Sequence, residues 1–106
     1  PLGGNVVRRD LGQKMMEDIT MYTKMSIEHS IANPDVALQF AKKWGRGIDD
    51  ETNREFVTMY VNERTIDYKP EGRESIRKFL KEGQIIGLID PGFDVDGLSF
   101  IGADGQ

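Results

Sequence analysis

The chain has 106 residues, of which 38% are hydrophobic and 30% charged, and its formal net charge is -4. This length suits one domain or part of one, and the acidic balance argues against nucleic-acid binding, which needs a clustered basic face. The absence of cysteine excludes disulfides, thiolate metal sites and cysteine nucleophiles, and no apolar run approaches the roughly 18 residues that cross a bilayer. We therefore expect a cytoplasmic chain with neither nucleic acid nor membrane as a partner.

Residues 1–10 are predicted to form a loop ahead of a helical region. Within it, Leu-Gly-Gly-Asn at residues 2–5 combines bare backbone N–H groups with an amide, which suits contact with a carboxylate or another anion. A plain loop explains the same residues, so both interpretations stay open. The chain opens on Pro1 and not on methionine, which favours an internal piece of a longer protein over a processed terminus.

Apolar residues at steps of three and four predict the first helix from about Asp10, its N-cap, to Met25. Beyond this helix the apolar positions shift to another face, which predicts a bend or a new helix near Ser26 that ends by Ala32. The predicted stripe consists of Leu11, Met15, Ile19, Tyr22 and Ser26.

A second helix is predicted to start at Asn33, which is placed to cap it, with Pro34 at the first helical position. Gly45 and Gly47 end this helix, because glycine tolerates the left-handed conformation that closes a helix. The residues predicted to mark its buried face are Ala37, Phe40, Ala41 and Trp44.

A third helix follows, with Asp49 or Asp50 as its cap. Its end is polar, since Asn62, Glu63 and Thr65 interrupt a segment that otherwise packs. These three side chains either satisfy helix-end carbonyls and the following turn or contact a ligand or partner lobe, and both interpretations stay open. The predicted buried stripe consists of Asn53, Phe56, Val57, Tyr60 and Val61.

A fourth helix is predicted from Pro70 to the residue before Gly83, with Ile76, Phe79 and Leu80 buried. Residues 84–106 are rich in glycine, and we expect an irregular tail that packs across the rest and contributes one short strand. The fold prediction is thus mainly α, with about four helices and an irregular tail.

Catalytic and metal-binding motifs are absent from the sequence. It contains no phosphate loop and no His-Glu-x-x-His, and the lone His29 cannot build a histidine metal site. We therefore expect no catalytic residue, metal site or cofactor in this chain, with His29 as a structural or surface residue at a helix end.

Several motifs together resemble one enzyme family. They are Pro-Leu-Gly-Gly-Asn-x-x-Arg-Arg-Asp-Leu at the start, Gly-Arg-Gly-Ile-Asp at 45–49, Phe-Val-x-Met-Tyr-Val-Asn-x-x-Thr-x-Asp-Tyr at 56–68 and Glu-Gly-Arg-x-Ser-Ile-x-x-Phe-Leu at 71–80. This order resembles the C-terminal part of the 1,4-dihydroxy-6-naphthoate synthases of menaquinone biosynthesis, over about residues 1 to 90. Chorismate dehydratase, a relative in the same futalosine route, is similar only over Val-Asn-x-x-Thr.

The resemblance implies an α/β fold of two lobes, like the type II periplasmic binding proteins, with the substrate cleft between the lobes. In that arrangement residues 1–10 return the chain beside the cleft, residues 11–83 are the helical part of one lobe, and residues 84–106 form the tail. The substrate-binding residues implied by the resemblance are Leu2, Gly3, Gly4 and Asn5.

The implied activity is a lyase reaction that converts cyclic dehypoxanthinyl futalosine to 1,4-dihydroxy-6-naphthoate. The catalytic histidine of the family lies in an upstream His-Glu-Gly sequence that this chain lacks, and His29 does not match it. We therefore expect these residues to need the upstream half in order to bind and convert the small-molecule substrate.

Two alternatives come from other functional classes: a helical module that docks on a partner through its methionine-rich face, and a ligand-binding lobe without catalysis. If half of a two-lobed protein stood alone, it would expose an apolar face. Such a face favours a homodimer or aggregation.

Overall fold

The structure, a computed structural model, describes residues 3–102 of the chain. Within this range the ordered elements are all helical, which confirms the mainly α prediction, and the short strand expected in the tail is absent as far as residue 102. The elements are the 3-10 helix η1 (Arg9–Leu11) and the α-helices α1 (Gln13–Ala32), α2 (Pro34–Lys42), α3 (Asp50–Tyr60), α4 (Glu63–Ile66) and α5 (Lys69–Ile85).

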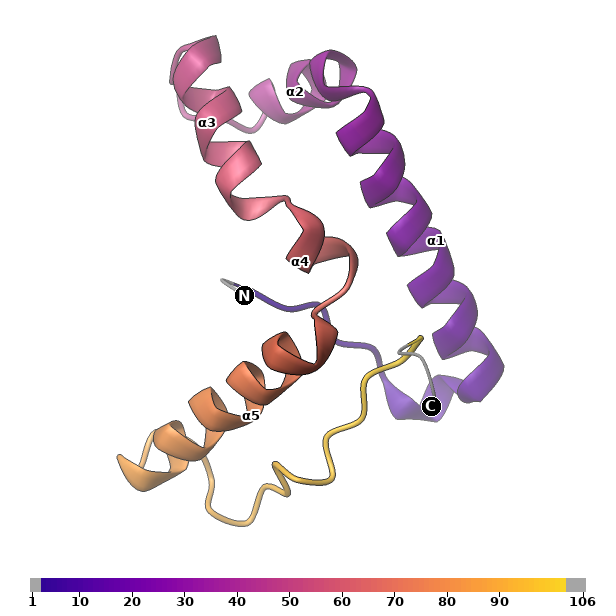
Figure 1. Cartoon of the computed structure of the whole chain (residues 1–106), viewed down its shortest axis with the longest axis vertical. Coiled ribbons are helices and arrows are strands. Elements are labelled where there is room, and N and C mark those ends of the chain that lie inside the picture. The colour runs from indigo at the N-terminus through magenta and orange to yellow at the C-terminus, as the bar shows by residue number, and fades with distance from the viewer. Residues whose placement is uncertain (1–2, 103–106) are drawn as a thin grey trace.

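The helices form an open arrangement. In Figure 1, α1 runs along one side, α2 turns across its end, and α3, α4 and α5 return along the other side. The irregular segment after α5 runs back toward the start of α1 (Figure 1). Direct helix contacts join α1 to α2 and α4, and α2 to α3. The radius of gyration is 16.3 Å, whereas a compact domain of this length has about 13 Å.

The start of the first helix differs from the prediction. Gly12, and not Asp10, is the residue before α1, and its φ of 80° lies in the region that glycine tolerates best. Asp10 belongs to η1, where its carboxylate accepts a hydrogen bond from Arg8 Nε at 2.9 Å. That contact lowers the pKa of Asp10 below its usual value. Asp10 is thus held by Arg8 and caps nothing.

The new helix predicted near Ser26 is also wrong, because α1 continues as one helix, but it ends at Ala32 as predicted. The sequence from 26 to 32 contains neither glycine nor proline, so nothing in it ends the helix. Its apolar side chains lie on a different face of the same helix. Ser30 Oγ donates to the Ser26 carbonyl at 2.9 Å within this continuous helix.

The caps around α2 and α3 follow the sequence in part. Asn33 does not cap α2 with its side chain; its amide instead donates to the His29 carbonyl at 2.9 Å and so closes α1. Gly47 has a φ of 78° after α2, as expected of a glycine at a helix end. Asp49 caps α3, since its Oδ1 accepts from the Thr52 backbone N–H at 2.9 Å. The cap prediction for the third helix is therefore confirmed.

The helices after α3 start and end at other residues than predicted. The polar break after the third helix contains a short helix, α4, that was not predicted. The helix predicted from Pro70 corresponds to α5, which starts at Lys69 and passes through Gly83 to end at Ile85. Gly83 therefore lies inside the helix that it was expected to end.

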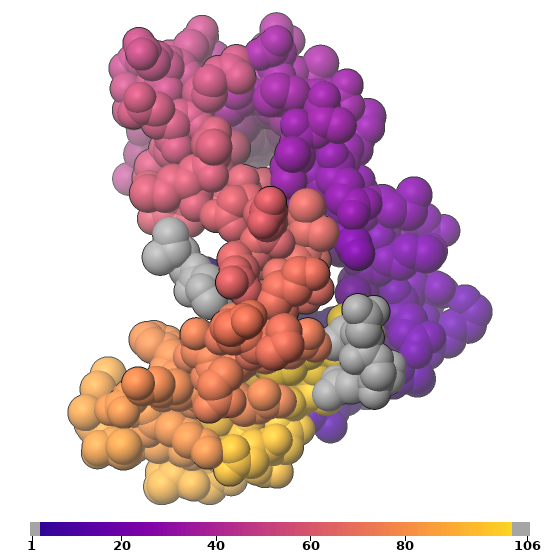
Figure 2. All heavy atoms as spheres, viewed as in Figure 1, coloured from indigo at the N-terminus to yellow at the C-terminus, as the bar shows by residue number. Residues whose placement is uncertain are grey.

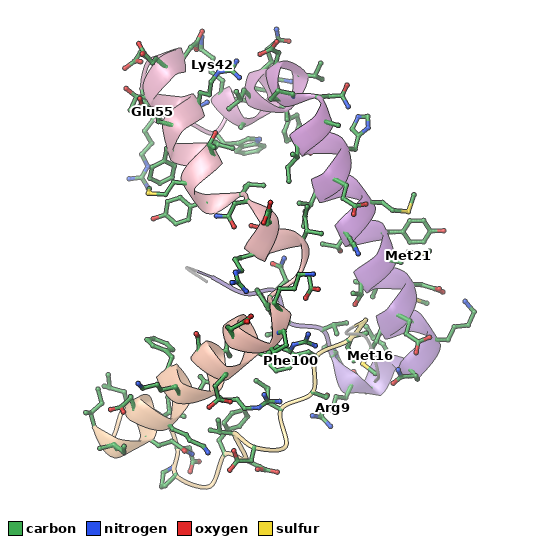
Figure 3. The ribbon with its side chains drawn as sticks, viewed as in Figure 1. Arg9, Met16, Met21, Lys42, Glu55 and Phe100 are labelled. Carbon is green, nitrogen blue, oxygen red and sulfur yellow. The ribbon has the colours of Figure 1, made fainter. Side chains whose placement is uncertain are left out.

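Most side chains predicted to be buried are exposed. The buried apolar residues among those described are Met16 and Val95, at 8% and 3% exposure. Figure 3 shows Met16 facing the interior beside the C-terminal segment and Met21 pointing away from the fold. The predicted buried residues that are exposed are Leu11, Met15, Ile19, Tyr22, Ser26, Phe40, Trp44, Phe56, Tyr60 and Phe79.

The physical reason is that each helix has a neighbour on only part of its apolar face. On α1 the more buried positions are Met16, Asp18, Thr20, Ile27 and Ser30, which lie outside the predicted stripe. Ile76 and Leu80 of α5 are half-buried, whereas Phe79 between them is exposed. Figure 2 shows the result as a surface that is hollowed between α3 and α1.

Candidate functional site

The glycine segment, residues 2–5, lies against the start of α5 through its described residues Gly3 and Gly4. Tyr68 Oη donates to the Gly3 carbonyl at 3.5 Å, a long hydrogen bond. A Cβ built on Gly4 would lie 3.0 Å from the same hydroxyl, so glycine permits this close approach. Gly3, Gly4 and Asn5 are exposed, and their backbone is thus positioned by Tyr68 while it stays open to solvent.

Tyr68 is held from two further sides. Its ring meets the Phe100 ring edge to face, with centroids 6.0 Å apart and planes at 85°. On α5, a Cβ built on Gly72 would lie 3.0 Å from Tyr68 Cβ, and Gly72 is buried. Phe100 in turn stacks with the guanidinium of Arg77, whose Cζ lies 5.2 Å from the ring centroid. The tyrosine is therefore fixed between the tail and its own helix.

The polar break, residues 62–65, leads from α3 into α4 shortly before Tyr68. Asn62 Oδ1 accepts from the Arg64 backbone N–H at 2.9 Å, and Thr65 Oγ1 accepts from the Asn62 backbone N–H at 3.1 Å. Thr65 Oγ1 also donates to the Tyr60 carbonyl at 3.0 Å. Asn62 and Thr65 thus cap α4 and close α3, which supports the structural interpretation of these residues. Glu63 is exposed in the first turn of α4.

Charged side chains then tie α4 to α5. Arg64 Nη1 donates to the Tyr68 carbonyl at 2.9 Å and lies 3.4 Å from Glu71 Oε2. The Glu71 backbone N–H near the start of α5, followed by Arg64, lowers the pKa of Glu71. The Lys69 backbone N–H, which donates to Asp67 Oδ1 at 2.9 Å, lowers the pKa of Asp67. Both carboxylates are therefore ionised at neutral pH and paired.

The turn between α4 and α5 is strained at one residue. Lys69 has a φ of 56°, the only positive φ outside glycine among the described residues. Pro70 follows it and disfavours the right-handed helical region at Lys69. The contacts of Asp67 with the Lys69 N–H and with Lys69 Nζ, at 3.2 Å, hold this conformation. The start of α5 is thus fixed by local contacts, which places Tyr68.

The sequence-predicted site residues are only partly described. Leu2 lies outside the described residues. Gly3 and Gly4 meet at Tyr68, whereas Asn5 is exposed and no described hydrogen bond uses its amide. His29 is exposed in the last turn of α1, where its Nδ1 lies 3.5 Å from Asn33 Nδ2. It is not among the residues that contact the glycine segment.

Sequence reasoning missed Tyr68 and Phe100 as members of this junction. One signal was available for Tyr68, because Gly72 follows it by one helical turn and leaves room for a large side chain on that face. Phe100 gave no such signal, since its position depends on the path of an irregular tail.

The junction can position backbone groups, and its carboxylates, Asp67 and Glu71, are both engaged in ion pairs. Among residues 3–102 no three histidine or acidic side chains gather closely enough to hold a metal ion. None of the described helices is both long and apolar enough to cross a membrane.

Comparison with known proteins places the chain in a family. The family model described as menaquinone biosynthesis matches residues 1–84. The chain belongs to the menaquinone biosynthesis family. The matched range contains the glycine segment, the polar break and Tyr68 with Gly72, whereas Phe100 lies beyond it.

Two curated proteins are similar to this chain, and both are named 1,4-dihydroxy-6-naphthoate synthase. The protein from Thermus thermophilus is 29% identical over 91 residues, which cover 86% of this chain and 34% of that protein. The protein from Streptomyces coelicolor is 26% identical over 100 residues, or 94% of this chain and 35% of that protein. The chain thus spans about a third of the length of these relatives. No solved structure matches it significantly.

Proposed function

We propose that this chain forms the C-terminal part of a 1,4-dihydroxy-6-naphthoate synthase, a lyase that converts cyclic dehypoxanthinyl futalosine to 1,4-dihydroxy-6-naphthoate in the cytoplasm. The observation that carries the proposal is the family match over residues 1–84, together with the names of the two relatives. The helices would complete one lobe of a fold like that of the type II periplasmic binding proteins. The remaining two thirds of the protein would supply the other lobe.

Within this proposal, the glycine segment lines the cleft and contacts the substrate. Its support is the exposed backbone at Gly3 and Gly4, held in place by Tyr68. Exposed N–H groups without side chains can approach a carboxylate or hydroxyl of a substrate closely. Leu2 and Asn5 belong to the same segment and take the same role. The chain supplies positioning groups, and the base comes from the upstream part.

A chimera tests this proposal directly. This chain would replace the matching third of the Thermus thermophilus synthase, and the purified chimera would be incubated with cyclic dehypoxanthinyl futalosine. We expect formation of 1,4-dihydroxy-6-naphthoate, detected by liquid chromatography with mass spectrometry. The unmodified synthase is the positive control, and the 106-residue chain alone is expected to be inactive. A folded chimera, judged by circular dichroism, that forms no product would overturn the proposal.

One observation favours a second candidate, a helical docking module without catalysis. Aromatic side chains such as Phe40, Trp44 and Phe56 are 62%, 78% and 52% exposed, which is more apolar surface than a monomer usually leaves uncovered. A stable but inactive chimera, combined with a self-associating 106-residue chain in sedimentation, would favour this module.

A further inference from the structure

The groove between α2 and α3 contains a polar side chain that makes no hydrogen bond within the described residues. The groove has a volume of about 440 Å³, and Asn53 of α3 lines it. Asn53 is 7% exposed and is the one buried polar side chain among the described residues. Its backbone N–H donates to the Asp49 carbonyl at 3.0 Å, whereas its side-chain amide makes no hydrogen bond within the described residues. No described buried side-chain N or O atom lacks a partner, so the polar atoms of this amide reach solvent and are open to an incoming group. Such a group has to replace the hydrogen bonds that water makes to the amide.

The charged residues of the groove are already paired with one another across it. Lys42 Nζ lies 2.7 Å from Asp50 Oδ1, and Arg54 Nη2 lies 2.5 Å from Asp35 Oδ1, so each ion pair joins α2 to α3. Figure 3 shows Lys42 at the end of α2 that faces α3. The groove therefore offers an amide between two neutralised pairs. An amide between two ion pairs suits a neutral group with one hydrogen-bond donor and one acceptor. It does not favour a free ion, because the paired charges of the groove leave little net charge.

We propose that Asn53 pairs with a backbone peptide group of the part of the family protein that this chain does not contain. A side-chain amide carries one acceptor and two donors, so it can bond both the N–H and the C=O of an extended peptide. The inference rests on the proposed function, since it takes the other part of the synthase as the occupant of the groove.

The surface area favours this occupant over a second copy. The chain exposes 8568 Å², about 1.4 times the area typical of a folded monomer of 12.0 kDa. The excess is roughly 2,500 Å², whereas a standard interface buries about 800 Å² on each partner. The relatives extend over about three times the length of this chain, and so contain enough protein to cover such an area.

The test compares one substitution in two settings. In the 106-residue chain, Asn53→Leu removes an amide that has no protein partner, so the thermal midpoint should stay unchanged or rise. In the chimera with the Thermus thermophilus synthase, the same change leaves the peptide group without its partner, and the midpoint should fall by about 2–8 °C. Gln39→Leu is the matched control, because Gln39 lines the same groove with an exposed side chain; its effect should have the same sign in both settings.

A second variant guards against poor packing of leucine. Asn53→Ser keeps a polar group but cannot bond both the N–H and the C=O of the peptide group. It too should lower the thermal midpoint of the chimera, and it should leave the midpoint of the isolated chain unchanged. A fall of equal size in both settings would overturn the inference, and so would the absence of any effect in the chimera. Loss of a dimer of the isolated chain on Asn53→Leu, seen by sedimentation, would assign the groove to a second copy instead. These readouts measure stability and not turnover, so a stable but inactive chimera would refute the proposed function and still test the groove.

Discussion

Phe100 in the tail meets Tyr68 at the start of α5 edge to face, with ring centroids 6.0 Å apart, although the two residues are far apart in sequence. Further along α5, the guanidinium of Arg77 lies over the Phe100 ring and donates a hydrogen bond to the Leu98 carbonyl at 3.2 Å. Phe100 therefore fastens the end of the tail to the start of α5, while Gln84 and Lys81 hold earlier parts of the tail through the Phe93 carbonyl and Asp96. Because Tyr68 also contacts Gly3, the Phe100 side chain also supports the glycine segment.

Phe100→Ala should consequently loosen the end of the tail from the start of α5. The lost contacts include one aromatic pair and one cation–π contact, worth together about 1–2 kcal/mol. Urea unfolding followed by circular dichroism would measure the difference. Phe79→Ala is the matched control, since Phe79 is 76% exposed, and it should cost less than about 0.5 kcal/mol. An equal loss of unfolding free energy in the two variants would show that the contacts of Phe100 do not stabilise the fold.

The helix boundaries could be predicted from the sequence wherever a local signal governs them. Asp49 precedes its helix with a carboxylate at the right distance from the Thr52 N–H, and Pro34 fits only the first turn. Asn33 shows the limit of this reasoning, because a side chain between two helices can bond to either, and here it bonds to the end of α1.

Burial could not be predicted in the same way. Periodicity identifies an apolar face, but whether Ile19 or Phe56 on that face is covered depends on a neighbouring element. In this open fold the neighbours cover Met16, which lies outside the predicted stripe, and Asn53, which lies within it, so the Asn53 side chain is more buried than the phenylalanine on the same helix. The contacts of the site between Gly4, Tyr68 and Phe100 depend on tertiary structure for the same reason.

Asp49→Ala should weaken α3, because the Thr52 N–H loses its acceptor. Asp49→Asn keeps an acceptor of similar quality and should preserve the helix at neutral pH. Circular dichroism at 222 nm during thermal unfolding would compare the three proteins. Similar midpoints for the alanine and asparagine variants would contradict the capping role.

The same cap should respond to acid. The backbone N–H of Thr52 lowers the folded-state pKa of Asp49, so the ionised form favours the folded state. This stabilisation is fully present above the unfolded pKa of about 3.9 and is lost as the pH falls through the lower folded pKa. The stability of the unsubstituted chain relative to Asp49→Asn should therefore be constant from pH 7 to about pH 5 and decrease below about pH 4.

Gly4→Ala should perturb the glycine segment, whereas Gly3→Ala should not. A Cβ at residue 4 would lie 3.0 Å from the Tyr68 hydroxyl, which is held by its own ring contact, but a Cβ at residue 3 would meet no atom within 4 Å. In the chimera with the Thermus thermophilus synthase, we expect Gly4→Ala to raise KM several-fold and Gly3→Ala to leave the stability of the fold unchanged. Equal kinetics of Gly4→Ala and the unsubstituted chimera would argue against contact between this segment and the substrate.

The effect of Gly83→Ala on stability should change sign when Ile89 is removed. Alanine is more favourable than glycine inside a helix by about 1 kcal/mol, so Gly83→Ala within α5 would ordinarily stabilise the chain. Here its Cβ would lie 2.7 Å from Ile89 Cδ1, in a tail that folds back on the helix through the Leu88 and Ile89 N–H bonds to the Gly83 carbonyl. The clash should make Gly83→Ala destabilising in the natural sequence.

In an Ile89→Ala background the same clash is absent, because the side chain that Gly83 accommodates has been removed. Gly83→Ala should then raise the free energy of unfolding by about 1 kcal/mol, as helix propensity alone requires. Urea unfolding of the four proteins gives the coupling between the two sites directly. Stabilisation by Gly83→Ala in both backgrounds would mean that the tail does not pack on α5 at this point, because only close packing of Ile89 makes the glycine necessary.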